Sequence, residues 1–329
     1  MADFSIIRLT HLSPIHIGTG KENYDFSSSA LQSDTLTSAI ASIRAQQGKA
    51  VDLASFLSSF CMSSAFPYYK DSYFFPKPQG RISIQVKGEE EYQYRKMLKK
   101  IQFLDLSIWK EILLGNQVSI ERSQIKKALV VSKADSDLPT IAKNQVNERV
   151  TVSRFNEDST PFFFEWKYYN QDGGLFVITD AKDALLKEIM FYLEVLGNQG
   201  LGTDKNIGGG KFTPEYAGVL HIEDIAEPDG RLLLSPCIPS EKELESIDLE
   251  KSKYSLIKRG GYIAGSEHPE FRHLRKRSVF MFDVGSILST QLPIVGKVVD
   301  LRPDWNDDKL HPVYRSGHAL SIPIKRQSI

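Results

Sequence analysis

The chain has 329 residues, of which 41% are hydrophobic and 25% charged, a composition typical of a soluble globular protein long enough for two domains. Its 41 basic residues balance 41 acidic ones, so it lacks the overall basic character of a protein that grips a polyanion alone. No apolar run approaches the roughly 18 residues of a membrane span, and the N-terminus lacks a basic, apolar leader, so neither export nor membrane insertion is expected. Cys61 and Cys237 lie far apart and lack metal-ligand spacing, so neither a zinc site nor a disulfide framework is indicated, which fits a reducing cytoplasm.

Hydrophobic spacing predicts a strand over 5–12 and then a short amphipathic helix over 31–43. Ser33 is its expected N-cap, and Asp34 in the first turn complements the helix dipole. A polar stretch at 132–147 is expected to form an insertion or a surface loop. Further helices are predicted at 53–66, 98–112 and 184–196, an aromatic run lies at 68–75, and strands are predicted at 149–154, 162–166 and 175–179.

The second half is richer in strands, and we place the domain boundary near Pro214. The stretch 283–292 is apolar enough to be either helix or strand. No internal repeat of fixed period is present. Strands are predicted at 216–222, 232–234, 254–257, 279–283, 296–301 and 319–324, with a short helix at 242–249.

A glycine-rich stretch, Gly200 to Phe212, follows the predicted helix at 184–196 and precedes a strand. Glycines let a backbone approach a ligand closely, and exposed N–H groups bind phosphate, so the stretch indicates a loop for a polyanion, with charge from Lys205 and Lys211. The spacing matches neither a Walker A loop nor a dinucleotide fingerprint. The alternative is a plain helix-to-strand connection.

Three further motifs accompany this loop: Leu12 to Gly20 after the first strand, Leu31 to Ile40 at the first helix, and His311 to Leu320 near the end. In this order the four motifs resemble the RAMP superfamily of CRISPR proteins, and most closely the family of the fourth subunit of the type III-A (Csm) effector complex. The resemblance spans the whole chain. It implies an α+β fold of two ferredoxin-like (RRM-like) domains, 1–213 with the glycine-rich loop and a protruding thumb-like hairpin insertion, and 214–329.

The resemblance also implies a function in antiviral defence. Such a subunit is non-catalytic, holds the 5′ tag of the CRISPR RNA, and bridges the large signalling subunit to the backbone subunits. It meets target RNA through the assembled complex, takes no cofactor or metal, has no membrane partner and is cytoplasmic.

Several residue types suit RNA binding, each with an alternative explanation. His16 could bond a nucleotide or be structural, and Arg149 and Arg154 could bind phosphate or pair with neighbouring glutamates. The basic run at 251–277 could instead be a solvated surface. The candidate RNA-binding residues are His16, Gly18, Gly20, Ser33, Arg149, Arg154, Gly200, Gly202, Lys205, Gly208, Gly209, Gly210, Lys211, Arg259, Arg315 and His318.

Two other functions compete with RNA holding. One is a metal-independent endoribonuclease that processes CRISPR RNA with His16 as general base, although no second acid or base is evident. The other is a small-molecule nucleotide-binding enzyme, whose motif spacing fails in the glycine-rich loop.

Overall fold

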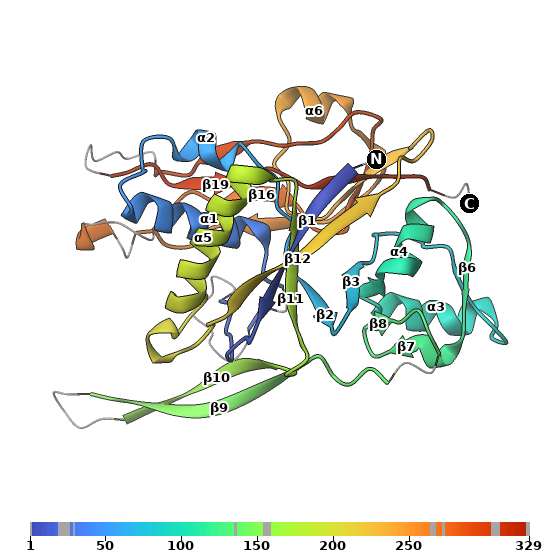
Figure 1. Cartoon of the computed structure of the whole chain (residues 1–329), viewed down its shortest axis with the longest axis horizontal. Helices are drawn as coiled ribbons and strands as arrows, with labels where there is room; N and C mark the ends of the chain where they lie inside the picture. Colours follow the sequence, from blue (N-terminus) through green and yellow to red (C-terminus); the bar gives the residue numbers. More distant parts are fainter. Residues whose placement is uncertain are drawn as a thin grey trace.

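The computed structural model describes residues 2–18, 27–28, 30–134, 137–153, 159–263, 268–271, 274–303 and 310–326. Within them, helices and strands are mixed along the chain, which confirms the expected α+β class. Figure 1 shows a body with two projections: a long hairpin at one end and a helical insertion at the other.

A largely antiparallel sheet organises the first half of the chain. Four of its strands lie in the antiparallel order β12-β1-β11-β2, and the sheet continues beyond β2 through four short strands, of which β5 and β8 pair in parallel. The strand predicted over 5–12 is present, but it runs from Ala2 to Thr10. The strands are β1 (Ala2–Thr10), β2 (Phe66–Tyr69), β11 (Gly173–Thr179) and β12 (Thr213–Ile222), then β3 (Ser72–Pro76), β5 (Phe103–Asp105), β8 (Leu129–Val130) and β7 (Ile125–Lys126).

Alternation along β1 places different side chains on the two faces of this sheet. Ile7 and Leu9 belong to the core that includes the apolar sides of helices α1 (Ser33–Gln46) and α5 (Asp183–Gln199). Phe4 and Ile6 belong to a second core, shared with the insertion and with strands of the second half. The sheet is therefore a middle layer that joins both halves of the chain.

Two predicted helix boundaries near the N-terminus are wrong. The N-cap of α1 is Gln32, without a side-chain cap, and Ser33 is the first helical residue, whose backbone N–H donates to Ser64 Oγ at 3.1 Å. The helix expected over 53–66 is only α2 (Leu53–Leu57). Beyond it, residues 60–65 run extended beside α1 and the sheet, as the backbone bonds of Ser63 and Ala65 show.

The helix expected over 98–112 is also wrong, because the chain breaks there into helix, strand and helix. Helix α3 (Glu91–Lys100) ends as Ile101 becomes extended, and α4 (Leu106–Leu113) begins at Asp105, whose carboxylate accepts from Ser107 N at 3.0 Å. Between them, β5 pairs with β3 and β8. With the parallel strands β4 (Ile84–Val86) and β6 (Val118–Ile120), these helices form an insertion at residues 77–131.

A two-stranded hairpin projects from the body, as Figure 1 shows. It consists of β9 (Ala142–Val152) and β10 (Ser159–Tyr169), paired without a register shift from Ala142 opposite Tyr169 to Val152 opposite Ser159. The strand predicted at 149–154 thus begins seven residues earlier, because cross-strand hydrogen bonds support polar residues that no core would accept. The predicted polar stretch at 132–147 supplies the first six residues of β9.

The second half contains a four-stranded sheet, two short strand pairs and helix α6 (Glu241–Ser246), whose capping box joins Ser240 and Glu243. The ambiguous stretch 283–292 contains a strand. Residues 213–222, beyond the predicted boundary, pair with β1 in the first sheet. The sheet strands are β14 (Asp248–Lys253), β17 (Ile287–Ser289), β13 (Gly230–Leu233) and β20 (Ser321–Ile324), and the pairs are β15 (Leu256–Arg259) with β16 (Val279–Phe282) and β18 (Val298–Asp300) with β19 (Tyr314–Ser316).

Candidate nucleic-acid interface

The glycine-rich loop at 200–211 is a compact, hydrogen-bonded turn. Gly200 ends α5 with φ 88°, and Leu201 N donates to Gly210 O at 2.9 Å, which closes the loop on itself. A single 3-10 turn, Lys205–Ile207, lies inside it. Lys205 and Lys211 are exposed, so the loop directs its two cations outward. Backbone φ is positive at Gly200, Gly202, Gly208 and Gly210.

At four glycines of this loop, Gly200, Gly202, Gly209 and Gly210, a Cβ would lie within 3.0 Å of another residue. A Cβ at Gly210 would collide with the carbonyl of Leu201, and φ there is 67°, which L side chains rarely adopt. A Cβ at Gly209 would lie 2.6 Å from the Trp166 ring of the hairpin. Gly209 therefore serves close packing against Trp166, because its φ is not in the left-handed region.

The segment after β1 is bound to this loop by five hydrogen bonds, one of which runs from Ser13 N to Lys211 O at 2.9 Å. Ser13 Oγ donates to Gly208 O at 2.8 Å and accepts from Lys211 N at 2.7 Å. Gly210 N donates to Pro14 O at 2.9 Å, and Thr203 N to His16 O at 3.0 Å. Two of the four sequence motifs, about 190 residues apart, thus form one surface, which we call the loop cluster. Gly18 is exposed next to it, near Thr203.

His16 is buried in the loop cluster, with 1% of its surface exposed. Its Nδ1 lies 2.8 Å from the carbonyl of Glu165, and its ring packs against Phe164 at 4.5 Å between centroids. The Glu165 carboxylate accepts from Ser27 N at 2.6 Å. A ring held in this way positions the loop, and it has little access to a nucleotide.

Arg149 connects the hairpin to the glycine-rich loop. Its guanidinium lies over the rings of Phe164 at 4.3 Å and Trp166 at 5.5 Å and forms an ion pair with Asp204. The alternative from the sequence is a pair with a neighbouring glutamate, whereas Asp204 is 55 residues away along the chain. About a quarter of the Arg149 side chain is exposed, which leaves the guanidinium within reach of a ligand.

A second cluster forms where α1 begins. Asp34 is completely buried and accepts from Arg259 at 2.8 and 3.0 Å, while Arg315 forms an ion pair with the same carboxylate. Arg259 also donates to Thr35 Oγ1 at 2.8 Å. The structure thus brings three predicted residues, Ser33, Arg259 and Arg315, to one place, the Asp34 cluster. The missed residue is Asp34 itself, which sequence analysis assigned only to the helix dipole.

Positive charge is in excess at the Asp34 cluster. Burial, together with the nearby Arg315 and Arg259 guanidinium groups, lowers the pKa of Lys276 to about 8. Burial also raises the pKa of Asp283, a second carboxylate that interacts with Arg259. Three cations therefore share one fully buried carboxylate, an arrangement that favours binding of an additional anion.

The remaining predicted residues lie apart or outside the described ranges. His318 Nδ1 lies 4.0 Å from Cys61 Sγ, and burial with the nearby Asp180 raises the pKa of that thiol to about 12. The backbone N–H of His318 donates to Ser316 Oγ at 3.2 Å. Gly20 and Arg154 lie outside the described residues.

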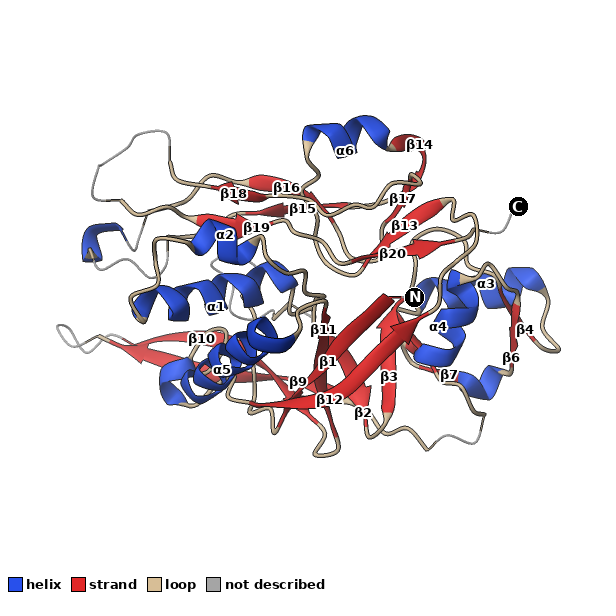
Figure 2. Cartoon of the chain, turned by 45° about the horizontal axis from the view of Figure 1, so that its top comes forward, coloured by secondary structure: helices blue, strands red, loops and turns tan. Residues whose placement is uncertain are grey.

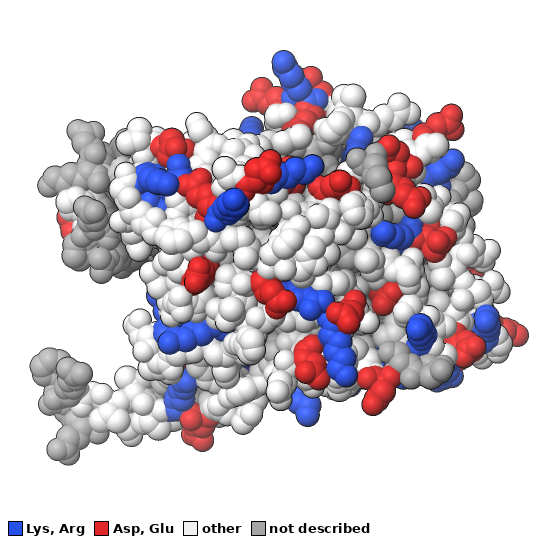
Figure 3. Space-filling model, in the orientation of Figure 1, with Lys and Arg blue, Asp and Glu red and all other residues white. Residues whose placement is uncertain are grey.

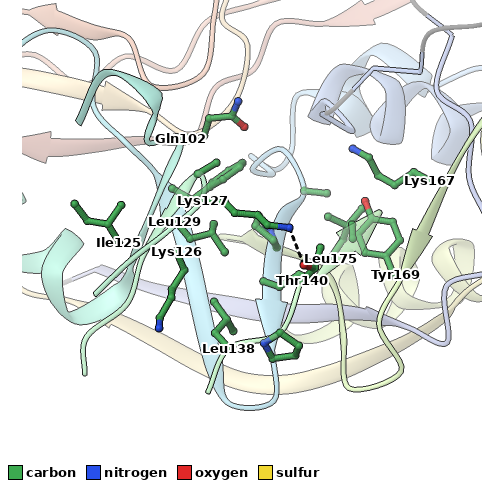
Figure 4. Close-up of a pocket in the computed structure, with 17 residues that line it drawn as sticks. Gln102, Ile125, Lys126, Lys127, Leu129, Leu138, Thr140, Lys167, Tyr169 and Leu175 are labelled. Carbon is green, nitrogen blue, oxygen red and sulfur yellow. Dashed lines mark hydrogen bonds between the residues drawn. The ribbon is translucent and has the colours of Figure 1, made fainter. Parts of the chain in front are cut away.

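A mainly apolar cavity of about 480 Å³ lies between the base of the hairpin and the β7–β8 turn (Figure 4). Lys127 Nζ donates to Thr140 Oγ1 across it at 2.9 Å, and Lys167 and Tyr169 line it from β10. The backbone of Lys167 pairs with Ile15 at 3.0 Å in both directions, so the cavity adjoins the loop cluster. Its volume lies within the range of about 300–1,000 Å³ for small-ligand sites and accommodates a nucleobase.

Charges of both signs are interspersed over the face drawn in Figure 3, where no continuous positive field appears. The hairpin leaves an open recess beside the body in that view. Among the described residues, no group of three or more His, Cys, Asp or Glu is placed to hold a metal ion. No helix in the described ranges is both long and apolar enough to cross a membrane.

Comparisons with known proteins agree with this geometry. Residues 227–324 match the family model of the CRISPR Csm4 C-terminal domain. A curated relative from Thermococcus onnurineus strain NA1, named CRISPR system Cms protein Csm4, is 24% identical over 269 residues, which cover 79% of this chain and 83% of the relative.

Two solved structures share the fold along almost the whole chain. A chain of a Csm1–Csm4 cassette in complex with cA4 is 19% identical with a TM-score of 0.61, and covers 99% of each chain. A chain of a Csm3–Csm4 subcomplex of a type III-A interference complex is 18% identical with a TM-score of 0.60, and covers 98% of this chain and 99% of the other.

The fold, the glycine-rich loop and the matching C-terminal region are similar to those of a RAMP-type subunit of a CRISPR effector complex. Within this class, residues 227–324 match the Csm4 C-terminal domain, and about four fifths of the chain is similar to a curated Csm4 protein of the type III-A (Csm) group.

Proposed function

We propose that this subunit binds RNA without cutting it, holds the 5′ tag of the CRISPR RNA, and bridges the large signalling subunit to the backbone subunits. One observation carries the RNA-holding part: the glycine-rich loop, the segment after β1 and the base of the hairpin form one connected surface. Exposed cations on a backbone-lined loop are suited to phosphates.

The Asp34 cluster extends this surface toward the second half of the chain. Ser27, bonded to Glu165, and Asp34 are seven residues apart, so they lie no more than about 25 Å from each other. A single RNA strand of a few nucleotides could contact both clusters. The excess cations beside Asp34 would bind one of its phosphates.

Burial of His16 supports holding over cleavage. A general base must reach the proton that it removes, and the His16 ring is enclosed by Phe164 and the Glu165 carbonyl. The endoribonuclease alternative therefore has no exposed base at its own candidate residue. We infer that wild-type protein leaves tagged RNA intact.

The order of elements supports the ferredoxin-like interpretation of the first half. Strand, helix, strand, strand, helix and strand follow one another as β1, α1, β2, β11, α5 and β12, with the insertion and the hairpin between β2 and β11. A second ferredoxin-like domain over 214–329 remains a proposal. The bridging role rests on the relatives, which are found with Csm1 in one structure and with Csm3 in another.

The test is equilibrium binding of an RNA that carries the 5′ tag to Gly209→Val. Valine collides with Trp166 and separates the loop from the hairpin, so affinity should fall about tenfold, as for the loss of about 1.4 kcal/mol of binding energy. Gly48→Val is the control. Gly48 has φ 81°, and among the described residues no atom beyond its chain neighbours lies within 4 Å of an added Cβ, so valine there strains the backbone away from the loop without a collision. Equal affinities for Gly209→Val and wild type would contradict the proposal.

A further inference from the structure

The insertion at 77–131 is basic within a neutral chain. It contains eleven Lys and Arg against six Asp and Glu, a net charge of +5. Figures 1 and 2 place it at the opposite end of the molecule from the hairpin. The loop cluster and the Asp34 cluster contain none of its residues, so the proposed function does not explain this charge.

A groove of about 870 Å³ opens between α3 and the segment 80–85 of this insertion. One face of α3 supplies Glu91, Tyr94, Arg95, Leu98 and Lys99, at the spacing that places side chains on the same side of a helix. Four cations line the groove against one carboxylate: Lys77, Arg81, Arg95 and Lys99 face Glu91.

The cations are held in fixed positions. Glu91 pairs with Arg95 at 2.7 Å and with Arg81, so one carboxylate holds two guanidinium groups side by side. Lys77 Nζ donates to Leu98 O at 2.9 Å near the C-terminal end of α3, and burial lowers its pKa. The groove therefore has an excess of positive charge before any ligand binds, and a cleft focuses such a field.

A smaller cavity of about 260 Å³ adjoins the groove and shares Arg81, Ile82 and Ser83 with it. It adds Lys253, Lys325 and Arg326 from the second half of the chain, against Asp229. The two cavities thus make a continuous basic path from α3 to the end of β20. A single phosphate would use only part of this path, whereas a polymer of phosphates would use all of it.

The lining also includes surfaces that suit bases. Ile82, Ile84 and Leu98 are apolar, Tyr94 is half-buried at the edge, and Gln117 donates to Gln85 at 3.3 Å. Aromatic and apolar faces beside a basic track are the means by which proteins bind single strands without sequence preference. An acidic peptide would use the cations but not these faces.

We propose that the groove between α3 and residues 80–85 is a second binding site for single-stranded nucleic acid, which takes a segment other than the one held at the loop cluster.

The test counts binding sites with a labelled single-stranded RNA of roughly ten nucleotides, within the usual site size of about 4–16. Full-length wild-type protein should bind two molecules per chain. The double variant Arg95→Ala with Lys99→Ala should bind one, with affinity at the groove reduced about tenfold and a salt slope lower by about 1.4, for two lost phosphate contacts. The matched control, Lys96→Ala with Lys100→Ala, removes two cations from the same helix outside the groove lining and should bind two.

The two proposals fail in different ways. One molecule bound by wild type, lost in Gly209→Val and unchanged in the groove variant, would overturn the second site and leave the proposed function intact. One molecule lost only in the groove variant would overturn the proposed function and support the second site. If poly-glutamate of matched charge displaces the groove-bound RNA as well as unlabelled RNA does, the assignment of the groove to nucleic acid is overturned.

Discussion

The side chain of Asp34, in the first half of the chain, binds two arginine side chains from the second half. Its carboxylate is completely buried and binds Arg259 and Arg315, so its loss leaves two cations near the core without their partner. Removal of one member of a buried ion pair costs about 3–5 kcal/mol. Asp34→Ala should lower the free energy of unfolding in urea by this amount.

The matched control is Asp71→Ala, which removes a fully exposed carboxylate from its pair with Arg8. An exposed pair contributes about 0–1 kcal/mol, so this variant should unfold almost as wild type does. Similar losses for the two variants would contradict the role assigned to Asp34.

Lys276, beside the Asp34 cluster, makes the stability of the fold depend on pH. Its folded-state pKa of about 8 lies below its ordinary 10.5, so the folded state bears the full cost of its charge below pH 8. This cost disappears as pH rises from 8 to 10.5, because the folded state releases the proton first. Lys276→Met should therefore stabilise the fold at pH 7 by about 2–3 kcal/mol, and the gain should vanish near pH 10.5.

The control is Lys258→Met, which replaces an exposed lysine on the neighbouring strand β15. The free energy of unfolding of both variants and of wild type is measured at pH 7, 8.5 and 10. A gain for Lys276→Met that stays constant across this range would show that its charge has no special cost in the fold.

At the scale of elements, the hairpin and the glycine-rich loop meet through Arg149. The pair with Asp204 is partly exposed, so Arg149→Ala should cost only about 1 kcal/mol of overall stability. Protection of the loop's backbone amides from hydrogen exchange should change more than overall stability does, because the loop loses its contact with the hairpin. Amide hydrogen exchange at 203–210 should become faster, while exchange in β1 and β11 stays as in wild type.

Arg122→Ala is a suitable control, because it removes an exposed arginine from another ion pair, with Glu89, in the insertion. Unchanged exchange at 203–210 in Arg149→Ala would mean that the loop keeps its conformation without the hairpin.

The sequence predicts elements well where one core decides them. The strand β1 and the helices α1 and α5 follow their apolar spacing, since each packs against the same sheet. Prediction fails where tertiary contacts override periodicity. Leu104 and Ile108 have helical spacing, but Leu104 pairs in β5 and the Asp105 cap starts a new helix. The polar residues before Arg149 show no strand signal, because cross-strand bonds alone hold them.

At the scale of the whole molecule, zero net charge limits the affinity of the isolated chain for RNA. Each phosphate neutralised on a single strand contributes about −0.7 to the slope of log affinity against log salt. With a few cations per site, the isolated chain should bind tagged RNA modestly, with a slope of about −2 to −3. Titrations from 50 to 300 mM salt test this.

The reconstituted complex should behave differently, because neighbouring subunits bury the RNA end and complete its contacts. Its affinity for the same RNA should change less over the same salt range. Tight, salt-insensitive binding by the isolated chain would contradict the dependence on assembly.

The candidate site was predictable in its parts but not in its connections. Glycine clusters and isolated cations are visible in the sequence, and they identify the loop and Arg149. The bonds from Ser13 to Gly208 and from Arg259 to Asp34 span 195 and 225 residues, and local patterns carry no signal for such pairs. The burial of His16 and the Trp166 contact of Gly209 are likewise consequences of packing.

The central claim, that this surface holds the 5′ tag, is tested most directly by photo-crosslinking in the reconstituted complex. A photoreactive nucleotide within the tag, followed by mass spectrometry, should give crosslinks to residues 200–211 and to the base of the hairpin at 143–153, with the RNA intact. Crosslinks confined to other segments of this chain, or to other subunits only, would contradict the account.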